Sequence, residues 1–145
     1  MDFFTSMEVS ASGLGAERTR MNVSASNLAN ASTTEGADGG PYRRRDVVLG
    51  SAPVGDRVSG ARAGAPTGGA MAVEVRGIVE DQSPPRLEYD PGHPDADVDG
   101  YVAYPNVNIV EEMVDMITAS RAYEAGVSAL EAAVSMAERP LGMGR

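Results

Sequence analysis

The sequence predicts an α+β fold, in which long N- and C-terminal helices form an antiparallel-type coiled-coil pair beside a small β-rich middle domain. Two observations predict it. Apolar residues repeat every seven positions at both ends of the chain, and the segment between them holds short alternating runs separated by Gly, Pro and Asp. The expected divisions are residues 1–35 for the N-terminal helix and its turn, 36–105 for the middle domain, and 106–145 for the C-terminal helix and tail.

The N-terminal repeat predicts a helix over roughly residues 3–31. One apolar row recurs every seven residues, and a second row lies three residues before it and is interrupted by Arg18. The two rows are Met7, Leu14, Met21 and Leu28, and Phe4, Ala11 and Ala25. Two internal glycines each cost about 1 kcal/mol relative to Ala, so this helix should need neighbours to be stable. It ends in "SNLAN", where Asn27 and Asn30 can bond to the backbone of a neighbouring subunit or cap their own helix.

The C-terminal repeat predicts a helix over roughly residues 107–139. Its seam alternates steps of four and three and consists of Ile109, Met113, Met116, Ser120, Tyr123, Val127, Leu130, Val134 and Ala137. Asn106 or Asn108 can cap its start, and the two glutamates that follow suit the positive end of the helix dipole. Pro140 is expected to end the helix.

The middle of the chain predicts three or four short strands. "PYRRRDVVLGSA" and "AMAVEVRGIVED" have apolar strand character, and "PPRLEYDPGHP" and "GYVAYP" read as two shorter strands flanked by turns. Residues 50–70 are rich in Gly, Ala and Pro and are expected to form a flexible loop outside the core.

The segment "DADVDG" raises the possibility of a calcium site. Asp95, Asp97 and Asp99, followed by Gly, match the opening of an EF-hand loop. The twelfth position, however, is Asn106 instead of Glu, and the prolines before the loop exclude a preceding helix. The interpretation that the spacing favours is an Asp/Gly-rich turn, with a small calcium-binding module as the alternative function.

Three other patterns give little indication of a catalytic or binding site. His93 is the only histidine and lies in a loop with no nucleophile motif near it, so no catalytic role is expected. The "GLG" at 13–15 lacks the third glycine and the preceding strand of a dinucleotide loop. The arginines at 43–45 alternate on a strand and are expected to form a solvated face with one ion pair within the chain. No cofactor and no enzymatic activity are expected.

Composition narrows the function classes further. The chain has 145 residues and a formal net charge of −9 that is spread along its length. This charge argues against nucleic acid as a partner, because nucleic-acid binding requires a stripe of Lys or Arg. It has no Cys, which excludes disulfides and thiolate metal sites. No apolar run approaches the roughly 20 residues that span a bilayer, and the first residues do not resemble a cleavable signal peptide.

Two segments resemble the bacterial flagellar rod and hook proteins. "SASGLGAERTRMNVSASNLANASTTEGADGGPYRRRDVVL" is similar to the N-terminal signature of that family, and "DPGHPDADVDGYVAYPNVNIVEEMVDMITASRAYEAGVSALEAA" is similar to the C-terminal half of a proximal-rod member. The resemblance runs through nearly the whole chain and is weakest over residues 50–70. In one departure, this chain carries Gly126 where the family usually has Asn.

The resemblance implies a structural subunit of the flagellar basal-body rod, with another rod subunit as the nearest alternative. It implies export through the flagellar type III apparatus without a cleaved signal and a periplasmic location in the rod. Partners would be other rod proteins, further copies, and the adaptor joining the rod to the export gate and membrane ring. The terminal helices would form a coiled coil in the inner layer of the axial drive shaft that transmits torque and houses the export channel. The residues of both seams, together with Asn27 and Asn30, are then the expected subunit contacts.

Overall fold

The computed structural model describes residues 3–36, 39–54 and 70–142. Two long helices enclose four strands in the chain order α1, β1, β2, β3, β4, α2. Their bounds are α1 Phe3–Ala29, β1 Arg45–Pro53, β2 Met71–Glu80, β3 Arg86–Tyr89, β4 Tyr101–Tyr104 and α2 Ile109–Gly142. The predicted α+β class and all four predicted strands are confirmed.

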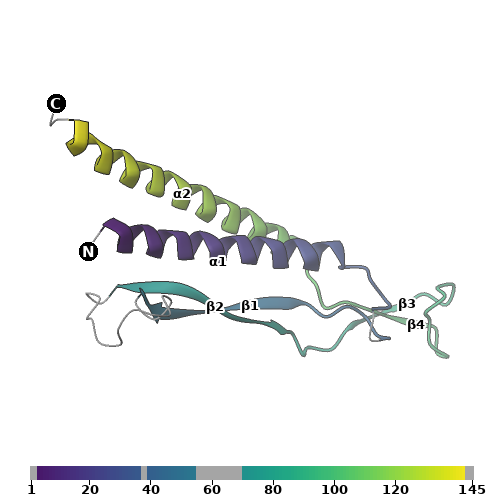
Figure 1. The fold of residues 1–145 in the computed structure, drawn as a ribbon. Helices are drawn as coiled ribbons and strands as arrows, with labels where there is room; N and C mark the ends of the chain where they lie inside the picture. The colour runs from purple at the N-terminus through teal and green to yellow at the C-terminus, as the bar shows by residue number, and fades with distance from the viewer. Residues whose placement is uncertain (1–2, 37–38, 55–69, 143–145) are drawn as a thin grey trace.

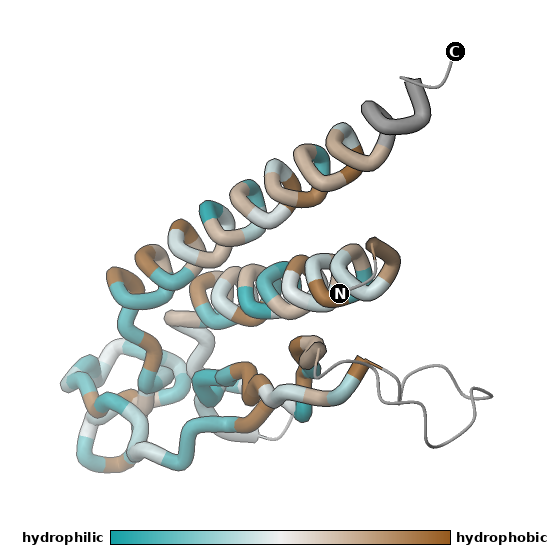
Figure 2. Tube along the Cα trace, turned by 90° about the vertical axis from the view of Figure 1, so that its left-hand side faces the viewer, coloured by the Kyte–Doolittle hydropathy of each residue, from teal (hydrophilic) through white to brown (hydrophobic). Residues whose placement is uncertain are grey.

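The elements are stacked in three layers, with α1 in the middle (Figure 1). The two helices are antiparallel, and the β1–β2 hairpin lies along the opposite side of α1, so α1 contacts both layers. Figure 2 shows from the side that α2 leaves α1 at an angle toward its C-terminal end. The start of α1 and the end of α2 lie at one end of the described structure, and β3 and β4 lie toward the other (Figure 1).

The β1–β2 hairpin is a twisted antiparallel ribbon whose register runs from Arg45 opposite Glu80 to Pro53 opposite Met71. A bulge between Val48 and Leu49 locally shifts the register, as one extra residue on β2 does in such ribbons. The expectation that residues 50–70 form a loop outside the core is wrong at both ends. Residues 50–53 belong to β1, and residues 54 and 70 are buried; residues 55–69 lie outside the described part of the chain.

The second sheet, β3–β4, pairs Arg86 with Tyr104 at one end and Tyr89 with Tyr101 at the other. Its Val102 is completely buried, whereas the ring of Tyr89 packs edge-on against that of Tyr101 on an exposed face. Thr34 Oγ1 donates a hydrogen bond of 2.7 Å to Asp95 Oδ2, which joins the segment after α1 to the loop before β4.

The buried apolar residues of the described part of the chain all have small side chains. They are all alanines and valines: Ala16, Val23, Ala31, Val54, Ala70, Ala72, Val102 and Ala119. In the described part no Leu, Ile, Met, Phe or Tyr is buried, and many of these larger residues are exposed. The small side chains let α1 approach its two neighbouring layers closely, but they remove little apolar surface from water.

Both helices differ from the sequence expectation mainly at their ends. α1 ends at Ala29, two residues early, and Asn108 caps α2 through a 3.1 Å hydrogen bond from the backbone N–H of Val110 to its Oδ1. The prediction that Pro140 ends α2 is wrong, because the helix extends to Gly142. A proline removes one backbone donor, and a helix can continue past that single loss.

Candidate functional site

The most buried positions of α2 lie one residue before members of the predicted seam. Glu112 and Ala119 are each 1% exposed, and Gly126 lies against Leu14 of α1. The predicted residues Met116, Tyr123, Leu130 and Ala137 are half-buried, and so are Ser120, Val127 and Val134. Ile109 and Met113 are exposed. Counting large apolar residues could not find a row made of Ala, Gly and one buried Glu.

Gly126 lies where the two helices touch. A Cβ added at this position would approach Leu14 Cδ2 to 2.7 Å, a distance that side-chain carbon atoms do not tolerate. Leu14 of α1 therefore fills the space that a side chain at position 126 would need.

The two predicted rows of α1 have different environments. Met7, Leu14, Met21 and Leu28 are half-buried between α1 and its neighbouring layers. Phe4, Ala11 and Ala25, from the other row, are exposed, and Phe4 retains 75% of its surface. In the isolated chain the first row is partly covered and the second is uncovered.

Asn27 holds the end of α1 against the start of β1. Its side chain is 1% exposed, and its Nδ2 donates to the carbonyl oxygen of Arg45 at 2.8 Å. Its Oδ1 accepts the backbone N–H of Arg45 at 3.0 Å and the hydroxyl of Tyr42 at 2.8 Å. The amide thus bonds to Arg45 as the backbone of a neighbouring strand would, within the same chain.

Asn30 caps its own helix. Its Nδ2 donates to the carbonyl oxygen of Ser26 at 2.9 Å, and its Oδ1 accepts the Thr33 hydroxyl at 3.2 Å. Asn30 therefore caps its own helix, whereas Asn27 bonds to the backbone of Arg45 in the same chain, a partner that neither predicted alternative named.

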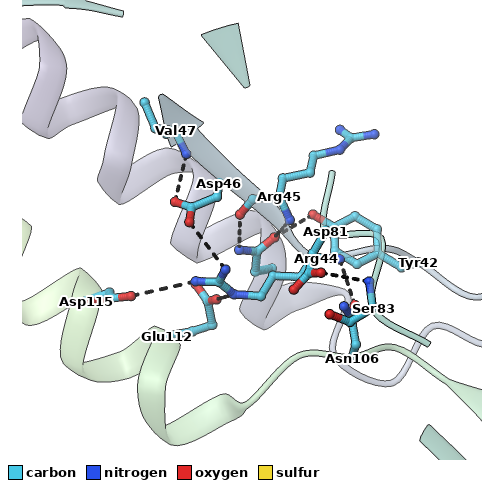
Figure 3. Close-up of polar contacts among 11 residues, drawn as sticks. Tyr42, Arg44, Arg45, Asp46, Val47, Asp81, Ser83, Asn106, Glu112 and Asp115 are labelled. Atoms are coloured by element: carbon cyan, nitrogen blue, oxygen red, sulfur yellow. Dashed lines mark hydrogen bonds and ion pairs between the residues drawn. The ribbon is translucent and has the colours of Figure 1, made fainter. Parts of the chain in front are cut away.

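Arg44, directly before β1, joins this segment to the first turn of α2 (Figure 3). Its Nε donates to Glu112 Oε1 at 2.6 Å, and Glu112 is 1% exposed. A further ion pair joins Arg44 Nη2 to Asp115 at 3.9 Å, and Arg44 N–H donates to Asn106 Oδ1. Burial by itself would lower the pKa of the Arg44 guanidinium, but the hydrogen bond and charge of Glu112, with help from Asp46, raise it overall.

The sequence interpretation missed this junction. It assigned Glu112 to the helix dipole and the arginines at 43–45 to a solvated face with one ion pair. Glu112, however, lies four residues before Met116 on the line that faces α1, and this spacing was the available signal. The second oxygen of Glu112 and the Nδ2 of Asn106 are buried without a hydrogen-bond partner in the described structure.

The acidic loop before β4 forms turns with its own backbone. Asp97 Oδ1 accepts the backbone N–H groups of Asp99 and Tyr101, each at 2.9 Å, and Gly100 has a left-handed φ of 82°. Among the described residues no three His, Cys, Asp or Glu side chains come together as a metal site would require. The geometry favours the turn over the calcium loop, and the backbone of Asp95 donates to His93 Nδ1 as part of the same turn.

An open groove of about 590 Å³ lies between α1 and α2. Met21 and Ala25 of α1 and Met116, Ile117 and Ser120 of α2 line it, and all five belong to or flank the predicted subunit-contact seams. Beside it, α2 exposes Ile109, Val110, Met113 and Val114. This uncovered apolar surface on the two helices, referred to below as the helix face, is the candidate functional site. Among the described residues, no helix is long and apolar enough to cross a membrane.

Comparison with known proteins places the chain in a class. Residues 7–37 match the family described as "Flagella basal body rod protein", and residues 98–142 match "Flagellar basal body rod FlgEFG protein C-terminal". These two matches define the class of flagellar basal-body rod proteins and cover most of both helices.

Individual relatives narrow this class. The chain is 45% identical to the flagellar basal-body rod protein FlgC of Borreliella burgdorferi, with 94% of this chain and 93% of the relative aligned. It is 44% identical to FlgC of Escherichia coli O6:H1 over 95% of both chains, and 42% identical to FlgC of Bacillus subtilis over the full length of both. The chain therefore belongs to the FlgC family of flagellar basal-body rod proteins.

Proposed function

We propose that this protein is a structural subunit of the proximal rod and that the helix face is where neighbouring rod subunits pack. Membership of the FlgC family makes it a structural protein of the flagellar basal body and not an enzyme. One observation carries the assembly surface: the buried apolar side chains of the described residues are all Ala or Val, while larger apolar side chains such as Met113 and Ile117 are exposed. A chain with that distribution gains most of its apolar burial from its neighbours.

In this proposal the segments 1–35 and 106–145 form the inner layer of the rod. Each helix would pack in coiled-coil fashion against helices of adjacent subunits, using the two predicted seams. The middle domain, residues 36–105, would lie outside that layer. The β1–β2 hairpin covers the opposite side of α1 from α2, which is compatible with an inside made of helices and an outside made of strands. Stacked subunits would form the drive shaft that transmits torque around the export channel.

The proposed partners follow from the position that this protein would occupy in the rod. Other rod proteins and further copies of this chain would contact the helix face, and the adaptor that joins the rod to the export gate and membrane ring would contact one end. The chain would reach the periplasmic rod through the flagellar type III apparatus without loss of a signal peptide. The matches to rod families at both ends of the chain support this proposal.

Substitution of an exposed residue on the helix face tests the proposal. In a host strain lacking its own copy, Ile117→Glu should abolish swimming and leave no completed rods in isolated basal bodies. Ile117 is 53% exposed, so the free variant should keep its free energy of unfolding within about 0.5 kcal/mol. The matched control is Val98→Glu, at a fully exposed apolar residue in the middle domain, which should swim. Normal motility of the Ile117 variant would contradict the proposal.

A further inference from the structure

The outer edge of β1 carries backbone groups that β2 does not use. In an antiparallel pair, successive residues of one strand turn their N–H and C=O groups alternately toward the partner strand and away from it. The backbone of Arg45 faces away from β2, because its N–H and C=O both bond to Asn27 of α1. The N–H of Val54 faces β2, because it bonds to the carbonyl oxygen of Ala70. The bulge places its extra residue on β2, so the alternation along β1 is unbroken and its odd-numbered residues all face outward.

Residues 47–51 form an open stretch of this edge. The outward-facing residues in it are Val47, Leu49 and Ser51. The N–H of Val47 donates to the side chain of Asp46 at 2.9 Å. Within the described residues, no hydrogen bond from outside the hairpin satisfies the outward N–H groups of Leu49 and Ser51, and both residues are exposed. The edge therefore presents two free donors to the surroundings.

Both ends of the open stretch are closed. At its start, Asn27 bonds to Arg45 as the backbone of a neighbouring strand would. At its end, Pro53 has no N–H to donate. Residues 47–51 contain no charge and no Pro, which are the features that commonly protect an exposed strand edge. The opening is thus limited to five residues, about 17 Å of strand.

An uncovered apolar face adjoins the open stretch. Leu49 lies opposite Val75, and Val47 lies opposite Ile78, so these four side chains share one face of the hairpin. Leu49, Val75 and Ile78 retain 39%, 37% and 50% of their surface. The other face carries Ala72, which belongs to the buried cluster that packs against α1. A strand added beside β1 would continue the uncovered face if apolar side chains occupied its alternate positions.

We infer that residues 47–51 bind an extended strand of a neighbouring rod subunit, which joins the hairpin as a third strand. The partner is an uncharged segment of about five residues with apolar side chains at alternate positions. Backbone hydrogen bonds to Leu49 and Ser51 hold it, and its side chains cover part of the apolar face. This binding presupposes the proposed place of the chain in the rod, and it uses a surface of the middle domain that is separate from the helix face.

An extended strand fits this surface better than a helix does. A helix uses its backbone N–H and C=O groups internally, so it would cover Leu49 and Ser51 without bonding to their backbone. Donors buried in that way would be left without a partner, which is unfavourable. A third strand satisfies the same donors, and it also stabilises a two-stranded hairpin, which is only marginally stable alone.

Amide hydrogen exchange of residues 47–51, in the free full chain and in isolated basal bodies, tests the inference. In the free chain the N–H groups of Leu49 and Ser51 should exchange quickly, because they face water. In basal bodies they should exchange about tenfold or more slowly, because hydrogen bonds to the added strand protect them. Equal exchange in the two states would overturn the inference.

A proline at position 51 separates backbone pairing from side-chain packing. Ser51→Pro removes an N–H that the hairpin itself does not use, so the free variant should keep its unfolding midpoint. The yield of completed rods should fall by about tenfold or more, because the partner strand loses a hydrogen bond and meets the proline ring. The matched control, Ser51→Ala, keeps the N–H and should assemble and swim as the wild type does. Normal rods with Ser51→Pro would count against the added strand.

Leu49→Lys carries the test if the proline unfolds the hairpin. Leu49 is exposed in the free chain, so the variant should fold, but its charge would lie against the uncharged partner strand. Rod yield should again fall by about tenfold or more, whereas Val79→Lys, at an exposed apolar residue of β2, should leave it unchanged. Normal assembly of the Leu49 variant, with Ile117→Glu still blocking assembly, would refute the added strand and leave the rod proposal standing.

Discussion

Replacing Asn27 with Ala tests the junction between α1 and β1. The substitution removes three hydrogen bonds, two with the backbone of Arg45 and one with the hydroxyl of Tyr42. Each such bond contributes about 0.5–1.5 kcal/mol net, and a partner left buried without water costs more. Asn27 is 1% exposed, but Arg45 is exposed and Tyr42 half-buried, so water can reach part of the vacated site. We therefore expect a loss of about 3 kcal/mol in the free energy of unfolding.

Urea denaturation followed by circular dichroism measures this loss, with Asn30→Ala as the matched control. Asn30 bonds only to its own helix and to Thr33, so its replacement should cost about 1 kcal/mol. Amide exchange should also show Arg45 N–H losing protection in the Asn27 variant alone. Equal losses for the two variants would refute the reasoning, because they would mean that Asn27 acts only as another helix-end residue.

Three other substitutions test particular contacts, each by the same denaturation experiment. Arg44→Met leaves Glu112 charged and buried and should lower the free energy of unfolding by about 3–5 kcal/mol. The double variant that also carries Glu112→Met should recover most of that loss. Equal losses for the single and double variants would mean that the ion pair does not hold α2 to the segment before β1. Gly126→Leu should be about 1–3 kcal/mol less favourable than Gly13→Leu, because only the side chain at position 126 displaces Leu14, and equal effects of the two substitutions would show that α1 and α2 do not touch there. Gly100→Ala should cost about 1–3 kcal/mol, because its φ is 82° and the new methyl group would meet a tyrosine ring at 2.9 Å; an unchanged midpoint would contradict the left-handed turn.

Much of the fold could be predicted because it depends on local patterns. The seven-residue spacing of apolar residues located both helices to within a few residues, since a helix with one apolar side shows this spacing directly. The runs of alternating apolar and polar residues located the strands, since a strand with one buried face has a period of two residues. Met116, Tyr123 and Leu130 of the predicted α2 seam are half-buried in the structure.

The side of α2 that faces α1 could not be predicted fully, because its other row is small or charged. Ala119 and Gly126 have little hydrophobicity to count, and Glu112 counts against burial until Arg44 is known to lie beside it. That neighbour is 68 residues away in the sequence. A pairing of this kind depends on the path of the whole chain, and no local period reports it.

The role of Asn27 illustrates the same limit at the candidate site. Its position at the end of a small-residue helix indicated a hydrogen-bonding role, and that indication was sound. The partner, the backbone of Arg45, became visible only when the turn after α1 brought β1 back alongside the helix. Which exposed residues contact neighbouring subunits stays a prediction from the two seams.

Thiol accessibility on assembled basal bodies tests the central claim most directly. The chain has no Cys, so a single introduced thiol reports one position without background from the rest of the chain. Ile117→Cys on the helix face should react with maleimide in the free protein and be protected in isolated basal bodies, while Val98→Cys should react in both. Full reactivity of the thiol at position 117 in assembled rods would contradict the claim that this face packs against neighbouring subunits.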